Sequence, residues 1–142
     1  MNFKAAGLGS PGREQLDWLK QEVGRLFSST PIVMFTHIPL WAVYPQWGWV
    51  TEDGEQALAS LQRFGSVTVL NGHIHQVMQK VEGQIIFHTA MSTVFSQPAP
   101  GAAPSPGPLK VPAEQLRRVL GIREVRYVQG QSHLAVVAST LV

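Results

Sequence analysis

The sequence predicts an α/β fold with an added antiparallel portion, and three observations support this class. Apolar residues recur at helical spacing near the start of the chain. Two short apolar runs, residues 32–36 and 67–70, are rich in β-branched side chains, as expected of strands covered on both faces. Glu82 and Gly83 separate two further strand-like runs and indicate a hairpin. The order helix, strand, helix, strand, hairpin is that of an α/β domain.

The first helix is expected to begin near Ser10 and Pro11, which suit the N-cap and the first helical position. Its apolar positions are Leu16, Leu19, Val23 and Leu26. Their spacing places all four on one face, so this helix should pack that face against the sheet.

The second helix is expected to begin at Thr51 and to end at Gly65, which is a plausible C-terminal stop. Glu52, Asp53 and Glu55 lie near its positive end, where carboxylates are favourable. A paired-carboxylate mechanism would need these same residues, and we prefer the helix-end explanation for them.

Residues 97–112 hold six of the ten prolines and cannot form a regular helix or a central strand. We expect an extended surface excursion or linker there. It separates residues 1–96 from residues 113–142, a predicted helix and a hairpin turning at Gly130 that complete the same domain.

The composition excludes several classes of function. The 142 residues contain no cysteine, which removes disulfides, thiolate metal sites and a cysteine nucleophile. The net charge of +2 is small and the basic residues are scattered, so no nucleic-acid or anionic-membrane surface is evident. The sequence also has no signal peptide, no apolar run of about 20 residues, no serine-nucleophile elbow and no P-loop. The compartment stays open, with the cytoplasm as the default expectation.

Three of the five histidines follow the two predicted strands. His37 comes after the first, and His73 and His75 come after the second. Sites in open α/β sheets collect beyond the carboxyl ends of strands, and neutral imidazole is a good ligand for divalent metals. In extended backbone His73 and His75 would face one side, and Gly72 would allow a sharp turn before them. The alternative is a pair of ordinary surface histidines.

The other two histidines are weaker candidates. His88 lies on the returning strand of the predicted hairpin and could approach the same region, but a buried structural role suits it as well. His133 is expected on the surface of the last hairpin.

Three stretches, "GREQLDWLKQEV", "IVMFTHIPLW" and "VTVLNGHIHQ", occur in that order. Together they resemble the C-terminal half of a calcineurin-like metallophosphoesterase over about residues 7–95. The resemblance implies a layered β-sandwich flanked by helices, of which residues 1–96 would be the C-terminal portion. It also implies a metal-dependent phosphoester hydrolase, a phosphatase or phosphodiesterase.

In such enzymes two metal ions about 3.5–4 Å apart share a hydroxide that attacks phosphorus. Manganese, iron and zinc are all suitable ions. The resemblance implies that His37 and His73 bind one ion and His75 the other, with Asn71 and Gly72 forming the turn that presents them.

The loop over residues 40–50 would then lie across the site. Its aromatic residues, which could form an apolar wall for the alcohol part of a phosphoester, are Trp41, Tyr44, Trp47 and Trp49. A local hydrophobic cluster is an equal alternative for this loop.

The sequence departs from the family in its acidic motifs. An Asp-x-His, a metal-bridging Gly-Asp and a Gly-Asn-His belong upstream of the matched region, and this sequence has none of them. Its only aspartates, Asp17 and Asp53, do not follow strands. Two neighbouring dications need anionic ligands to offset a repulsion of several kcal/mol, so we expect no stable two-metal centre from this chain alone. The missing half should also leave an open sheet edge or an exposed apolar face.

Three hypotheses follow. The chain is the metal-binding part of a phosphohydrolase whose N-terminal half is missing or lies on another chain, and is weakly active or inactive alone. Alternatively, it is a degenerate binding or assembly module, or it forms a mononuclear three-histidine site. The substrate class within phosphoesters stays open at this point.

Overall fold

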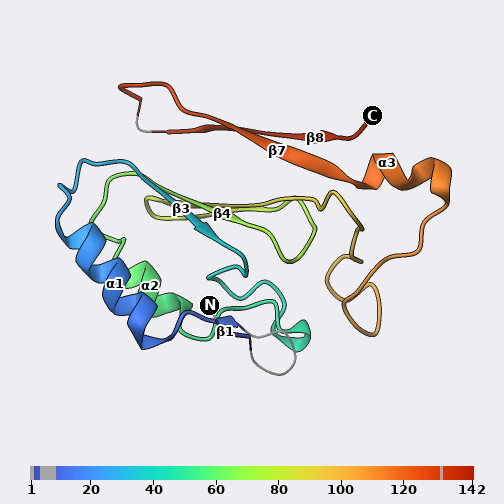
Figure 1. The fold of residues 1–142 in the computed structure, drawn as a ribbon, viewed down its shortest axis with the longest axis horizontal. Coiled ribbons are helices and arrows are strands. Elements are labelled where there is room, and N and C mark those ends of the chain that lie inside the picture. Colours follow the sequence, from blue (N-terminus) through green and yellow to red (C-terminus); the bar gives the residue numbers. More distant parts are fainter. Residues whose placement is uncertain (1, 4–8, 132) are drawn as a thin grey trace.

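A four-stranded mixed sheet is the centre of the computed structural model, which describes residues 2–3, 9–131 and 133–142. The strand order is β3-β4-β6-β5, with β3, β4 and β6 parallel and β5 antiparallel to β6. The strands of this sheet are β3 (Ile32–Thr36), β4 (Val67–Asn71), β5 (Gln79–Glu82) and β6 (Ile85–Thr89). The predicted α/β class is thus confirmed (Figure 1).

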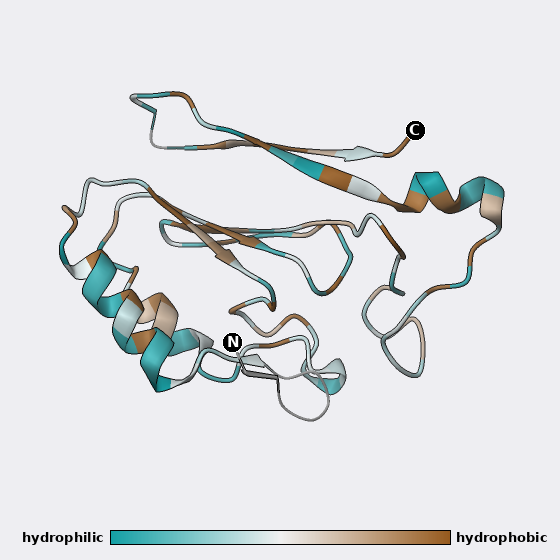
Figure 2. Ribbon diagram, in the orientation of Figure 1, coloured by the Kyte–Doolittle hydropathy of each residue, from teal (hydrophilic) through white to brown (hydrophobic). Residues whose placement is uncertain are grey.

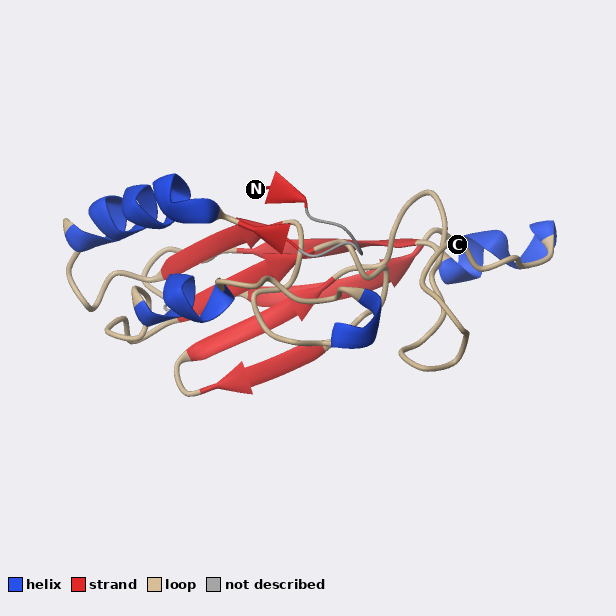
Figure 3. Ribbon diagram, turned by 90° about the horizontal axis from the view of Figure 1, so that it is seen from below, coloured by secondary structure: helices blue, strands red, loops and turns tan. Residues whose placement is uncertain are grey.

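The remaining elements lie on either side of this sheet or beside it (Figures 1 and 3). The helices are α1 (Gly12–Gly24), α2 (Gly54–Ala59) and α3 (Leu116–Val119), with 3₁₀ turns at Pro45–Trp47 and Ala113–Gln115. Two short antiparallel pairs are formed by β1 (Asn2–Phe3) with β2 (Gly9–Ser10) and by β7 (Gly121–Arg126) with β8 (Ala135–Thr140). None of the described helices is long and apolar enough to cross a bilayer.

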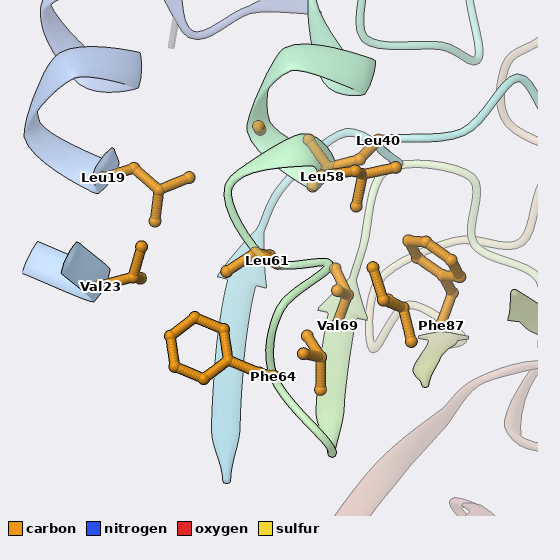
Figure 4. Close-up of a cluster of buried hydrophobic side chains, with 11 residues drawn as sticks. Leu19, Val23, Leu40, Leu58, Leu61, Phe64, Val69 and Phe87 are labelled. Carbon is orange, nitrogen blue, oxygen red and sulfur yellow. The ribbon is translucent and has the colours of Figure 1, made fainter. Parts of the chain in front are cut away.

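The main hydrophobic core lies between the sheet and helices α1 and α2 (Figure 4). Alternate residues of β4 and β6 point to this side, since side chains of a strand alternate between its two faces. The buried members are Leu19, Val23, Leu40, Ala57, Leu58, Leu61, Phe64, Val67, Val69, Ile85 and Phe87. The predicted apolar face of the first helix packs here through Leu19 and Val23, with Leu16 at its margin, whereas Leu26 lies beyond the end of α1 and is exposed, so its inclusion in that face is wrong.

The β7–β8 hairpin lies on the opposite side of the sheet from α1 and α2 (Figure 1). It is joined to the strand β6 by Arg123, whose Nη1 lies 2.8 Å from Nδ1 of His88. The Gly121 amide also donates to the Ser92 carbonyl at 3.1 Å. The predicted hairpin around Gly130 is therefore present and is attached to the main sheet.

The prediction that both faces of residues 32–36 are covered is wrong. Val33 and Phe35 on β3 are 42% and 78% exposed. β3 is an edge strand, and within the described residues no strand pairs with its outer edge. Hydrophobic residues run along β3 and β4, although only β4 is buried on both faces (Figure 2).

The predicted start of the first helix is also corrected. Ser10 belongs to β2, and its hydroxyl donates to Asp53 Oδ2 at 3.0 Å instead of capping its own helix. The same Asp53 oxygen accepts from the Gly12 amide at 3.3 Å, so a carboxylate distant in sequence satisfies the start of α1. The second helix ends at Ala59, well before Gly65.

The glycine at the start of α2 is packed against backbone, which generates a prediction. A Cβ at Gly54 would lie 2.2 Å from the Leu40 carbonyl oxygen, whereas nothing lies within 4 Å of a Cβ at Gly24 in the last turn of α1. Gly54→Ala should lower the free energy of unfolding by about 1–3 kcal/mol through overpacking. The matched control Gly24→Ala should raise it by roughly 0.5–1 kcal/mol. Urea unfolding measures both changes, and equal effects would contradict this account.

Candidate metal centre

Two of the predicted ligands, His37 and His73, lie side by side beyond the carboxyl ends of β3 and β4. Their ring centroids are 5.2 Å apart and the rings meet edge to face at 74°. The parallel register pairs Thr36 with Asn71, so both loops begin at the same level of the sheet. The Gly72 amide donates to the His37 carbonyl at 3.1 Å, which carries the pairing one step beyond the strands.

The backbone after β4 is not extended, contrary to the sequence-based expectation. His73 and His75 have φ of 64° and 54°, in the left-handed region that residues other than glycine rarely adopt. The turn is therefore made by the histidines themselves, and not by a positive φ at Gly72. Ile74 between them is fully buried against Trp47 and Trp49, and this burial helps to offset the backbone strain.

His75 is oriented by the segment that follows the sheet. Its Nδ1 lies 2.8 Å from the Phe95 carbonyl oxygen, and its ring packs at 4.4 Å on the Phe95 ring. Since a carbonyl only accepts, Nδ1 carries the proton and Nε2 keeps its lone pair. Metal-binding histidines usually donate their other ring N–H in this way.

The electrostatics favour neutral imidazoles. Burial, together with smaller contributions from the nearby His37 and His75, lowers the pKa of His73 from 6.5 to about 4. Burial also lowers the pKa of His75, the bond to the Phe95 carbonyl raises it, and His37 lowers it. Neutral imidazole is the form that coordinates metal, so the lowered pKa values of His73 and His75 favour the coordinating form of both rings.

The spacing of the first two rings suits one metal ion. Two imidazoles that bind a shared ion at about 2.1 Å per nitrogen have ring centroids roughly 5 Å apart, as His37 and His73 do. Asn71, two residues before His73, also has an oxygen available, because its buried Oδ1 has no hydrogen-bond partner while its Nδ2 donates to Thr36 Oγ1.

A closed ligand set is not formed by the described residues as they stand. Within residues 2–3, 9–131 and 133–142, no three His, Asp or Glu side chains are arranged so that they could hold an ion together. No carboxylate is among the side chains that approach one another here, and a bridged pair of dications would need anionic ligands. The structure thus brings His37 and His73 together but does not form a closed ligand set from the described residues.

The aromatic loop divides into two groups. Trp47 and Trp49 line a cavity of about 340 Å³ together with His73. Trp41 instead packs on Phe87 at 4.8 Å, at the edge of the main core. Tyr44 meets the edge of Trp47 at 5.1 Å and does not line this cavity. Trp47 and Trp49 belong to a buried hydrophobic cluster and also border the cavity, whereas their role as a wall for a substrate stays a prediction.

The sequence analysis missed part of this cavity. Gln97, Pro106 and Gly107, all from the segment expected to be an excursion or linker, form its remaining wall with Gln46. That segment has neither helix nor strand, as predicted, but it is folded back onto the site. A glutamine followed by a proline-rich run gives no sequence signal that its side chain is buried or that the segment folds back onto the site.

The two weaker histidines lie elsewhere. His88 is on the hairpin side of the sheet, where it accepts a hydrogen bond from Arg123, so the structural role is the one observed. His133 is exposed, near the start of β8.

The chain matches no protein-family model, and no curated protein matches it.

The contact between His88 and Arg123 predicts a pH dependence of stability. Burial lowers the pKa of His88 from 6.5, and the Arg123 guanidinium lowers it further. The folded chain therefore resists protonation that the unfolded chain accepts, so the stabilisation is fully present above pH 6.5 and is lost as the pH falls through the lowered pKa. Between about pH 7.5 and pH 5 the free energy of unfolding should fall less steeply in His88→Gln than in the original chain. Urea unfolding at each pH measures this free energy in both proteins. The same slope of the free energy of unfolding against pH in His88→Gln and in the original chain would contradict this account.

Proposed function

We propose that this chain is the metal-binding part of a metal-dependent phosphoester hydrolase of the calcineurin-like type. The observation that carries the proposal is the edge-to-face approach of His37 and His73 beyond two adjacent parallel strands. The Phe95 carbonyl, which orients His75, supports it because it leaves Nε2 of that ring as a donor. The resemblance of the three sequence stretches supplies the reaction class.

In this proposal the residues around the site have distinct roles. Nitrogens of His37 and His73 hold a divalent ion, which when bound would supply a Lewis acid for the phosphoryl oxygens and lower the pKa of water. His75 adds a further nitrogen donor. The cavity beside His73 receives the alcohol part of the ester, with Trp47 and Trp49 limiting access of water to it.

The anionic ligands that a two-ion centre needs would come from a segment outside these 142 residues, on the same chain or another. The edge and outer face of β3 are suited to receive such a segment, since Val33 and Phe35 are exposed and apolar. A second sheet over this face would complete the layered β-sandwich that the resemblance implies. Alone, the chain would be weakly active or inactive.

A mononuclear histidine site is the second candidate, and a specific observation favours it. The donors of this site are imidazoles and the Asn71 amide oxygen, with no carboxylate among them, and burial lowers the pKa of His73 to about 4. Zinc sites with neutral nitrogen donors and an open position can activate water without a second ion. A degenerate binding module, the remaining alternative, would bind no metal.

Metal titration of the purified chain separates these candidates. Zn²⁺ or Mn²⁺ should bind at one equivalent, and His73→Ala or His37→Ala should weaken binding at least about tenfold, since even an outer-shell partner contributes that much. His133→Ala, on the exposed hairpin, is the matched control and should bind as the original chain does. Metal analysis that finds no ion in the original chain would reject both metal-dependent candidates.

Hydrolysis of p-nitrophenyl phosphate and bis-p-nitrophenyl phosphate with Mn²⁺ tests the reaction. We expect little turnover from the chain alone, and a gain when a polypeptide carrying the Asp-x-His, Gly-Asp and Gly-Asn-His motifs is added. His73→Ala should abolish the gain. Turnover that is unchanged in His73→Ala would remove the assignment of the metal site.

A further inference from the structure

We propose that residues 97–107 form a specificity wall of this site, positioned by Gln97, and that the cavity they enclose selects a phosphoester with an uncharged, ring-sized alcohol group. This inference rests on the proposed function for the phosphate, and it adds the class of alcohol and the segment that selects it.

The side chain of Gln97 connects the wall to the loop that carries His73. Its side chain is buried, with 8% of the residue exposed, and its Nε2 donates to the His73 carbonyl at 2.7 Å. Its Oε1 accepts from the Gly107 amide at 3.1 Å. The side-chain amide of Gln97 therefore bonds both to the backbone of His73, a metal-ligand candidate, and to Gly107 at the other end of the wall.

Two further bonds hold this arrangement. Nε2 of Gln76 donates to the Gln97 carbonyl at 2.5 Å, which ties the wall to the residue after His75. The Leu109 amide donates to the Ser96 carbonyl at 2.8 Å and closes the loop at its base. Five prolines reduce the conformational freedom of the backbone between Ser96 and Leu109, which favours one fixed shape of the wall.

The lining of the cavity indicates what it accepts. In the part of the chain that the structure describes, the seven lining residues are Gln46, Trp47, Trp49, His73, Gln97, Pro106 and Gly107, and none has an acidic or permanently cationic side chain. A charged group placed there would lose its hydration without a counter-charge. An aromatic or other flat apolar group would gain contacts with the indoles and the proline ring, while the amides could bond a hydroxyl.

The volume sets the size. At about 340 Å³ the cavity lies near the lower end of ligand pockets, which is sufficient for one ring system beside the phosphate. Aryl or nucleoside-like phosphoesters therefore fit, whereas esters with a zwitterionic lipid headgroup do not, and neither does pyrophosphate, an anhydride that has no alcohol group.

The test compares probes by NMR on the full chain, following the indole N–H signals of Trp47 and Trp49 and the side-chain amide of Gln97. Without metal, phenol should shift these signals, which tests the wall independently of phosphate chemistry. With Zn²⁺, phenyl phosphate should bind about tenfold or more tightly than pyrophosphate, a difference of about 1.4 kcal/mol. No shift with phenol, or equal affinity for the two phosphate probes, would overturn the proposal.

Substitutions in the wall test whether Gln97 positions the lining of the cavity or only stabilises the fold. Pro106→Ala alters the lining and should reduce the preference for phenyl phosphate over inorganic phosphate, whereas Pro104→Ala, exposed on the same segment, should leave it unchanged. Gln97→Met keeps the side-chain length but removes both side-chain bonds, including the one to the His73 carbonyl, and should weaken binding of phenyl phosphate clearly more than binding of inorganic phosphate. A uniform loss of affinity for both ligands in Gln97→Met would indicate a purely structural role and overturn the positioning.

Binding of inorganic phosphate distinguishes a failure of the proposed phosphohydrolase function from a failure of the specificity wall. If it fails to bind the Zn²⁺-loaded chain while phenol still shifts the cavity signals, the phosphohydrolase proposal fails and the wall stands as an aromatic binding site. If inorganic phosphate binds and phenol does not, the phosphohydrolase proposal stands and the wall fails.

Discussion

The parallel pairing of β3 with β4 is the constraint on which the candidate site depends. It places Thr36 beside Asn71, and the Gly72 amide then bonds the His37 carbonyl as the two chains leave the sheet. The side-chain bond from Asn71 to Thr36, and that from Thr36 to the Ile38 carbonyl at 3.0 Å, hold the two exits together. His37 and His73 are neighbours because these exits are neighbours, although 35 residues separate them in sequence.

Beyond this register, the site is maintained against backbone strain. Two histidines in the left-handed region are unfavourable by on the order of 1–3 kcal/mol each, and such conformations persist only where the surroundings enforce them. The surroundings here are the fully buried Ile74, the bond from Gln97 to the His73 carbonyl and the bond from His75 to the Phe95 carbonyl. Since two of these come from residues 95–97, the chain after the sheet is part of the structure of the site and not an appendage to it.

Charge limits what this site could hold. Burial keeps His73 neutral at physiological pH, and the carboxylate of Asp53 is engaged at the start of α1. A set of neutral donors can attract one dication but cannot hold two at close range. β3, which leads into His37, is an edge strand whose Val33 and Phe35 are exposed, so the proposed function would place the missing ligands on a segment that also covers this strand.

The sequence by itself determined the features that depend on neighbouring residues. The runs at 32–36 and 67–70, the hairpin at Gly83 and the helical face of Leu19 and Val23 were predicted because strand and helix periodicity are local properties. Only the tertiary structure decided the exposure of Phe35, the capping of α1 by Asp53, the left-handed turn at His73 and the role of Gln97. Each of these depends on whether segments far apart in the chain come into contact. No local pattern of residues encodes which distant group will bond a given polar atom or cover a given face.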